Sequence, residues 1–184
     1  MAFQNLYFIA LLPPKNVSEQ ITALKQEIAQ HYKRTRALRV MPHITLKAPF
    51  KLNNDKHSQV LEWFRDISIT VPPFNIELNG FGAFDNNRSP VIYVKPIVSG
   101  ELVKLQEDVI KCFEAEFPGC GISFIERNFK PHMTIAYRDL QYSMFTKAWP
   151  NYKDRNYNAE FTVNSICLLQ HDGRQWNVIA EQLL

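Results

Sequence analysis

The sequence has little that would anchor it in a membrane or cross-link it outside the cell. Its longest uninterrupted apolar run, Leu6 to Leu12, has seven residues, whereas a membrane-spanning helix needs about 20. The first basic residue is Lys15, so the charged start of a secretory signal is missing before this run. The three cysteines form no CxxC pair, which argues against a disulfide framework or a zinc ribbon. We therefore expect a cytosolic protein with no membrane partner.

Common nucleotide-binding and hydrolase motifs are also missing. The chain has six glycines, and Gly80 and Gly82 are not followed by the third glycine of a dinucleotide-binding fingerprint. No GxxxxGKS/T, HExxH or GxSxG motif and no DxD pair occurs. The sequence therefore lacks the motifs typical of P-loop nucleotide binding, zinc proteases, two-metal phosphatases and ordinary serine hydrolases. The net charge of +3 permits an anionic ligand without requiring a long duplex.

The apolar pattern predicts a mixed α+β fold in one domain, residues 1–184, because no low-complexity linker divides the chain. Helical periodicity and strand-forming runs predict helices over 17–32, 60–67, 102–113 and 142–149, and strands over 5–12, 43–50, 74–79, 91–94 and 132–137. Asn16 and Ser99 are the expected helix N-caps. Asp172-Gly173 predicts a type I′ hairpin that joins strands over 161–170 and 174–180.

One motif occurs twice, about half a chain apart: Pro42-His43-Ile44-Thr45-Leu46 and Pro131-His132-Met133-Thr134-Ile135. Such a repeat predicts two halves of one architecture. Alternate side chains of a strand share a face. One polar face is therefore expected to carry His43, Thr45 and Lys47, and the other is expected to carry His132, Thr134 and Arg138. If a pseudo-twofold relates the halves, these faces meet in a single groove.

Two histidines and two threonines in one groove suit displacement at phosphorus. The ordinary pKa of histidine, near 6.5, lets one ring accept the attacker's proton while the other protonates the leaving oxygen. The hydroxyls of Thr45 and Thr134 can donate to the phosphate oxygens, and Lys47 and Arg138 can offset the charge. This chemistry requires no metal and no cofactor. Tyr7 can either face the groove and stack on a base or pack in the core.

The two tetrapeptides that begin at His43 and His132 resemble those of the two-histidine phosphoesterase superfamily, in which H-h-S/T-h (h, apolar) occurs twice. The chain is most similar to the branch of bacterial 2′-5′ RNA ligases and RNA 2′,3′-cyclic phosphodiesterases. The resemblance implies a bilobal fold: two antiparallel sheets related by a pseudo-twofold, with helices outside and a central groove. It also implies metal-independent opening of a cyclic phosphate to a 2′-phosphomonoester, with His43 as proton donor and His132 as acceptor. The expected partner is RNA or a nucleotide with a cyclic phosphate or a 2′-5′ linkage, and the expected state is a monomer.

Other interpretations of these residues stay open. The histidines can be hydrogen-bonded core residues or metal ligands, the threonines ordinary strand residues, and the two cations solvated. A non-catalytic module that binds single-stranded RNA would keep the groove without turnover, and ligation would use the same residues in reverse. An RNA end, a small cyclic nucleotide, ADP-ribose cyclic phosphate and a 2′-5′ oligonucleotide are alternative substrates, because pocket walls choose among them. His57 and His171 are expected at the surface.

Overall fold

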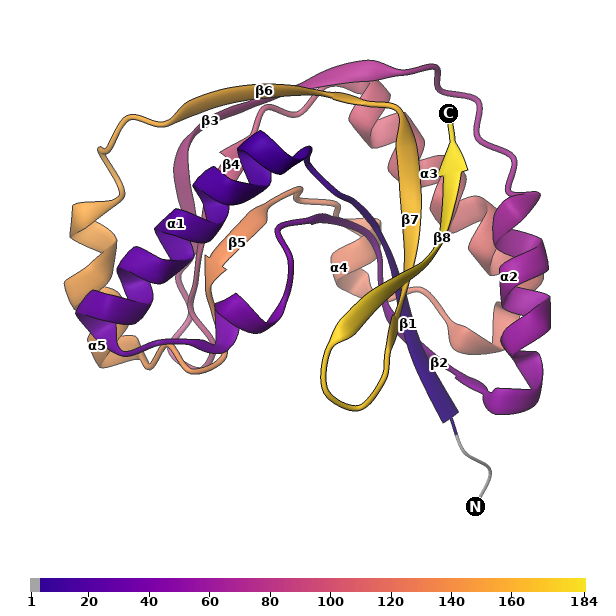
Figure 1. Ribbon diagram of the computed structural model, residues 1–184, viewed down its shortest axis with the longest axis horizontal. Helices are drawn as coiled ribbons and strands as arrows, with labels where there is room; N and C mark the ends of the chain where they lie inside the picture. The colour runs from indigo at the N-terminus through magenta and orange to yellow at the C-terminus, as the bar shows by residue number, and fades with distance from the viewer. Residues whose placement is uncertain (1–3) are drawn as a thin grey trace.

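Two four-stranded antiparallel sheets form the frame of residues 4–184, the part of the chain that the computed structural model describes (Figure 1). Sheet A has the strand order β2-β1-β7-β8, and sheet B has the order β5-β4-β3-β6. The strands are β1 (Gln4–Leu11), β2 (Ile44–Asn53), β3 (Phe74–Phe84), β4 (Val91–Pro96), β5 (Met133–Ala136), β6 (Asn158–Val163), β7 (Ser165–His171) and β8 (Trp176–Leu183). The predicted α+β fold with two antiparallel sheets is confirmed. The strand that follows each Pro-His motif, β2 or β5, lies at the edge of its sheet.

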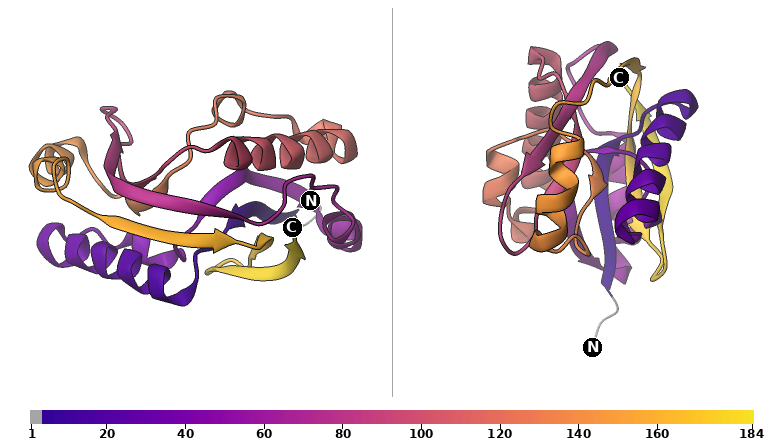
Figure 2. Two further views of the ribbon diagram at one scale, coloured as in Figure 1. Left: turned by 90° about the horizontal axis from the view of Figure 1, so that it is seen from above. Right: turned by 90° about the vertical axis from the view of Figure 1, so that its left-hand side faces the viewer.

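The described residues also form five α-helices. They are α1 (Lys15–Tyr32), α2 (His57–Arg65), α3 (Gly100–Glu116), α4 (Phe124–Arg127) and α5 (Tyr142–Ala148), with short 3-10 turns η1 (Arg36–Arg39), η2 (Asn54–Lys56), η3 (Pro118–Cys120) and η4 (Trp149–Asn151). Helix α1 packs against β5 and β6 of sheet B, whereas α3 packs against β2 of sheet A. Figure 2 shows α1 and α3 on opposite sides of the molecule. No helix among residues 4–184 is both long and apolar enough to cross a membrane.

The two lobes are not the two halves of the sequence, although the motif recurs about half a chain apart. Sheet A joins β1 and β2 to the C-terminal strands β7 and β8, while sheet B uses the strands between them. The predicted strand over 161–170 is two strands, because the chain leaves sheet B at Val163 and enters sheet A at Ser165. This crossover connects the lobes near the C-terminus (Figure 1).

Local signals at the ends of elements have mixed outcomes. Ser99 accepts a hydrogen bond from the Leu102 amide and caps α3, as predicted. Helix α1 begins before Asn16, with Pro14 at its N-cap position and no side-chain cap. The prediction of a type I′ turn is also wrong, because that turn needs a positive φ angle at two successive residues. In this loop of the described chain only Gly173 has a positive φ angle, of 95°. The side chain of Asp172 closes the loop instead, by accepting from the amides of residues 174 and 175.

One cluster of buried apolar side chains runs through both sheets and holds Ile9 and Leu168 of sheet A with Ile135 of sheet B. A smaller cluster, which contains Phe8 and Ala10, covers the other face of β1. Because alternate residues of a strand point to opposite faces, both faces of β1 are apolar and buried. The groove side of the strand therefore carries apolar side chains.

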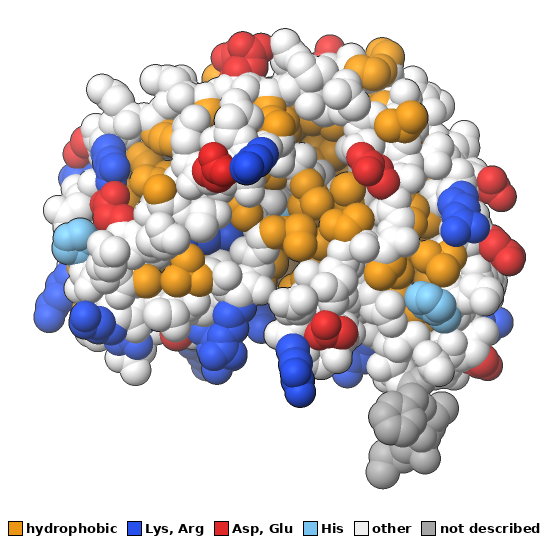
Figure 3. All heavy atoms as spheres, in the orientation of Figure 1, with side chains coloured by type: hydrophobic (Ala, Val, Ile, Leu, Met, Phe, Trp, Pro, Cys, Tyr) orange, Lys and Arg blue, Asp and Glu red, His pale blue; other side chains and the backbone are white. Residues whose placement is uncertain are grey.

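A basic segment lies at the end of α1 and in η1. It consists of Lys33, Arg34, Arg36 and Arg39. Figure 3 shows Lys and Arg side chains along the lower edge of the molecule, over these elements. The segment gives this edge a positive potential that attracts anions over a Debye length of about 10 Å.

Candidate active site

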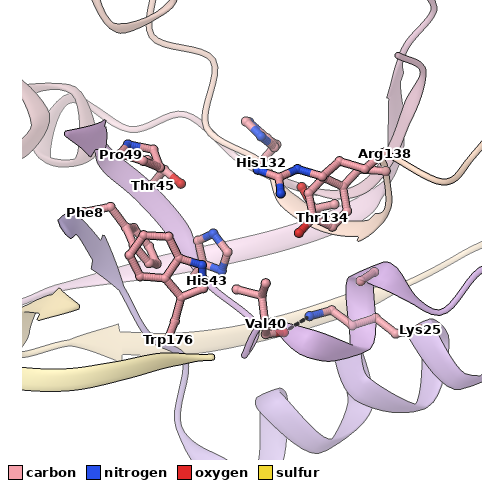
Figure 4. A pocket seen from close by; sticks show the side chains of 12 residues that line it. Phe8, Lys25, Val40, His43, Thr45, Pro49, His132, Thr134, Arg138 and Trp176 are labelled. Atoms are coloured by element: carbon pink, nitrogen blue, oxygen red, sulfur yellow. Dashed lines mark hydrogen bonds between the residues drawn. The ribbon is translucent and has the colours of Figure 1, made fainter. Parts of the chain in front are cut away.

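The repeated motifs come together around one cavity of about 190 Å³. His43 and Thr45 line it from the start of β2, and His132 and Thr134 line it from the start of β5 (Figure 4). The other lining residues are Phe8, Lys25, Ala37, Val40, Pro49, Tyr137, Arg138 and Trp176. All four predicted motif residues thus share one cavity, although the two copies are distant in sequence. Because both imidazoles line an open cavity, neither is sealed in the apolar core.

The two imidazoles are held in the same way. Nδ1 of His43 lies 2.7 Å from the Met41 carbonyl oxygen, and Nδ1 of His132 lies 2.8 Å from the Lys130 carbonyl oxygen. A carbonyl oxygen only accepts, so each Nδ1 carries a hydrogen and the neutral ring has its lone pair on Nε2. An aromatic ring packs against each imidazole. The ring centroid of Phe8 lies 5.1 Å from that of His43, and the ring centroid of Phe84 lies 4.9 Å from that of His132. Both rings therefore keep Nε2 as their free proton-accepting atom.

The surroundings of both rings favour the neutral imidazole. Burial lowers the pKa of His43 to about 4, against the opposing effect of the Met41 carbonyl, and the positive charges of Lys25 and His132 lower it further. Burial also lowers the pKa of His132. This differs from the expectation that ordinary pKa values leave one ring protonated near neutrality. An anion placed between the rings would raise both pKa values, because a negative charge favours the imidazolium form.

Arg138 lines the cavity as predicted, but for a different reason. Strand β5 ends at Ala136, so strand alternation does not orient Arg138. Its backbone has a left-handed φ of 57°, which is uncommon for a residue with a Cβ atom and often marks a functional site. The guanidinium lies 5.2 Å from the centre of the Tyr137 ring. A turn after β5 therefore places this cation at the cavity, where it stays exposed.

The expectation that Lys47 shares the groove face of Thr45 is wrong. In the ladder with β1, Thr45 pairs with Ala10 and Lys47 pairs with Ile9, so β2 contains an extra residue between these pairs. Such a β-bulge reverses the alternation of side chains. Lys47 consequently turns into the core, where it is 3% exposed and its Nζ lies 2.6 Å from Oε1 of Glu126.

Tyr7 also lies outside the groove, so of its two expected roles stacking on a base is wrong and packing in the core is confirmed. Its side chain is fully buried, because it shares the core face of β1 while Phe8 takes the cavity face. The Tyr7 hydroxyl accepts a hydrogen bond from Asn5 Nδ2 and lies 2.9 Å from Nδ1 of His57. His57, expected at the surface, is half-buried and makes this partly buried contact. His171, at the end of β7, is partly buried and accepts a hydrogen bond from the Gly173 amide.

Lys25, Phe8 and Trp176 are cavity residues that the sequence did not predict. Lys25 is 3% exposed on α1, and its Nζ donates to the Val40 carbonyl oxygen at 2.8 Å. A signal for Lys25 exists: it lies four residues after Ile21 in the buried stripe of α1, where an apolar residue is expected. The rings of Phe8 and Trp176 meet edge to face with centroids 4.5 Å apart, and no spacing in the sequence connects them.

Two antiparallel sheets with a His-x-Thr motif at the edge of each, facing one cavity, define a two-histidine phosphoesterase. A family model described as the 2′-5′ RNA ligase superfamily matches residues 13–175, and the chain belongs to this superfamily. A relative in Geobacillus kaustophilus, named "Putative phosphoesterase", is 30% identical over 173 residues, with 94% of this chain and 92% of the relative covered.

Solved structures share the fold across nearly the whole chain. LigT of Escherichia coli in complex with 3′-AMP has a TM-score of 0.71 at 20% identity, with 99% of both chains covered. Usb1 of Kluyveromyces marxianus has a TM-score of 0.58 at 12% identity and covers 95% of this chain and 97% of its own. These likenesses show the fold, and the family match shows that the protein is of the phosphoesterase and 2′-5′ RNA ligase type.

Proposed function

We propose that the protein hydrolyses 2′,3′-cyclic phosphates at RNA ends or on nucleotides to 2′-phosphomonoesters, by acid and base catalysis without a metal. The observation that carries this proposal is the pair of imidazoles with free Nε2 atoms on one cavity. Displacement at phosphorus needs one group to take the attacker's proton and another to protonate the leaving oxygen. The matched His43 and His132 supply one group each, and the basic segment, whose turn η1 also contains the cavity residue Ala37, suits an anionic substrate.

In the proposed reaction, Nε2 of His132 accepts a proton from water as the water oxygen bonds to phosphorus. The bond from phosphorus to O3′ breaks, and Nε2 of His43 gives its proton to O3′. The products are a 2′-phosphomonoester and a 3′-hydroxyl, and proton exchange with solvent restores both rings. Thr45 and Thr134 donate hydrogen bonds to the non-bridging oxygens, while Arg138 offsets their charge. The direction of proton transfer follows the family resemblance, and the bound anion supplies the rise in pKa that His43 needs as a donor.

Hydrolysis of an oligoribonucleotide that ends in a 2′,3′-cyclic phosphate, in excess chelator, tests the proposal. We expect turnover to persist, and His43→Asn and His132→Asn each to lower kcat by about 10²- to 10⁴-fold. His31→Asn is the matched control, because His31 is exposed on α1. Activity that disappears with chelator, or that survives both cavity substitutions, would exclude the mechanism. Salt-dependent binding of single-stranded RNA without product, unchanged in both variants, would indicate a non-catalytic module instead.

A change of leaving group tests the direction of proton transfer. A p-nitrophenyl phosphodiester needs little protonation of its leaving oxygen, because p-nitrophenolate is a weak base. We therefore expect His43→Asn to retain most of its activity on that ester, whereas His132→Asn loses activity on both substrates. The opposite pattern would exchange the two roles and leave the two-histidine mechanism intact.

A further inference from the structure

A buried ammonium group without a carboxylate partner lies in the wall of the cavity. Lys25 is 3% exposed, and its hydrogen bond to the Val40 carbonyl oxygen uses one of three N–H donors. No ion pair formed among residues 4–184 includes Lys25. Figure 4 shows its ammonium end directed from α1 toward Val40, in the wall of the cavity that His43 and Thr134 also line. Two donors of a buried cation are thus left for a ligand.

The remaining charged and titratable groups of the cavity explain which ligand fits. His43 from the start of β2, His132 from the start of β5 and Arg138 after β5 line the same space, as does Tyr137. Burying an ammonium is costly unless an opposite charge or strong acceptors surround it, and burial lowers the pKa of Lys25 to about 8. A cavity with two cations, two imidazoles and two hydroxyls is complementary to an oxyanion.

We propose that Lys25 is a substrate-binding residue whose two free N–H groups donate to non-bridging oxygens of the phosphoryl group held between His43 and His132. This inference rests on the proposed function. Helix α1 packs on β5, which carries Thr134, while Val40 precedes the first motif. Lys25 therefore reaches the phosphoryl group from a helix of one lobe and is held by the segment that leads into the other. The contact strengthens as negative charge grows on the phosphoryl oxygens in the transition state.

Substitution on the same helix separates this role from a structural one. Lys25→Gln removes the positive charge, Lys25→Arg keeps it, and Lys15→Gln is the control because the Lys15 side chain is 90% exposed on α1. Loss of charge-assisted hydrogen bonds corresponds to about a 10- to 100-fold weaker Kd for inorganic phosphate, measured by calorimetry at pH 7. We expect this loss in Lys25→Gln, a smaller loss in Lys25→Arg and none in Lys15→Gln. For the cyclic phosphate, Lys25→Gln should lower kcat more than it raises KM.

The pH dependence of phosphate binding gives a readout that a structural lysine would not change. In the wild type, affinity should fall above pH 8, because the deprotonated amine of Lys25 no longer attracts the anion; Lys25→Gln should lack this decline. Nuclear magnetic resonance of labelled lysine in the wild type needs no substitution and covers the case of a variant that does not fold. Added phosphate should raise the pKa of Lys25, because the anion favours the ammonium form.

The outcomes distinguish this inference from the proposed function. Phosphate affinity within twofold of wild type in Lys25→Gln, or a Lys25 pKa that does not respond to phosphate, would overturn the inference even if cyclic phosphates are hydrolysed. A wild type that binds no phosphate would overturn it as well. A protein that binds phosphate through Lys25 without hydrolysing any cyclic phosphate would support the inference and contradict the proposed function.

Discussion

Removal of either partner of the Lys47–Glu126 ion pair should destabilise the fold and leave substrate affinity unchanged. The two side chains are 3% and 5% exposed, with Nζ and Oε1 2.6 Å apart. Glu126 is further held by the amide of Ala48, which donates to Oε1, and by the amide and hydroxyl of Ser123, which donate to Oε2. Lys47 Nζ lies 4.5 Å from the centre of the Phe113 ring. The pair thus joins β2 to α4 away from the cavity.

The expected magnitude follows from the burial of both charges. Breaking a buried pair by removing one partner typically costs about 3–5 kcal/mol, because the other charge is left uncompensated. Burial raises the pKa of Glu126, but hydrogen bonds from Lys47 and Ser123 outweigh it and lower the pKa, so the carboxylate is ionised at pH 7. For a chain of 184 residues, about 2–4 °C of Tm is lost per kcal/mol. We therefore expect Lys47→Met to lower Tm by about 6–20 °C.

A double-mutant cycle in urea, followed by circular dichroism, measures this coupling. Lys47→Met and Glu126→Gln should each be strongly destabilised, and the double variant should be less destabilised than the sum of the two, because it leaves no unpaired charge. Below its Tm, Lys47→Met should bind the cyclic phosphate with the KM of wild type. A Lys47→Met variant as stable as wild type with a raised KM would refute this reasoning and return Lys47 to the substrate.

Three further predictions concern groups around the cavity. Folding lowers the pKa of His43 from 6.5 to about 4, so the contribution of this group to stability is complete above pH 6.5 and falls by up to about 3 kcal/mol towards pH 4. The urea midpoint of His43→Asn should therefore decline less than that of wild type as the pH falls from 6.5 to about 4. Equal declines in the two proteins would contradict this prediction. Tyr7→Phe loses the partly buried contact with His57 and should cost about 1 kcal/mol in urea unfolding with kcat/KM unchanged, whereas a raised KM would put Tyr7 at the substrate. In Gly82→Ala a Cβ atom would lie 2.5 Å from ring atoms of Tyr93. The Tyr93 ring centroid is 5.5 Å from that of His132, so displacement of this ring should lower kcat for the cyclic phosphate. Gly100→Ala, whose Cβ atom would meet no atom within 4 Å, is the control, and equal kcat values in the two variants would contradict the steric argument.

The sequence predicts the features of the fold that depend on short-range patterns. The stripe of α1, the cap at Ser99 and the doubled His-x-Thr motif are each visible within a few residues. The doubled motif alone predicts the four residues that meet at the cavity, whereas the two antiparallel sheets were expected from the family resemblance that the motif carries. The crossover from β6 to β7 was not predictable in this way, because strand-forming residues continue from Phe161 to Gln170 while the chain changes sheets.

The errors at the site have two physical origins. A bulge in β2 reverses the direction of Lys47 relative to Thr45, and simple alternation assumes that no residue is inserted. Strand β1 is buried on both faces, so its apolar run has no period of two that would tell the cavity face of Phe8 from the core face of Tyr7. Lys25, by contrast, could have been found as a charged residue in an otherwise apolar helical stripe.

A crystal structure of the protein with inorganic phosphate at pH 6 tests most directly whether two imidazoles act on one phosphorus atom. The account predicts one phosphate ion with oxygen atoms within about 2.6–3.2 Å of Nε2 of both His43 and His132. A phosphate that contacts one ring alone, or rings whose Nε2 atoms face away from a shared ion, would contradict it.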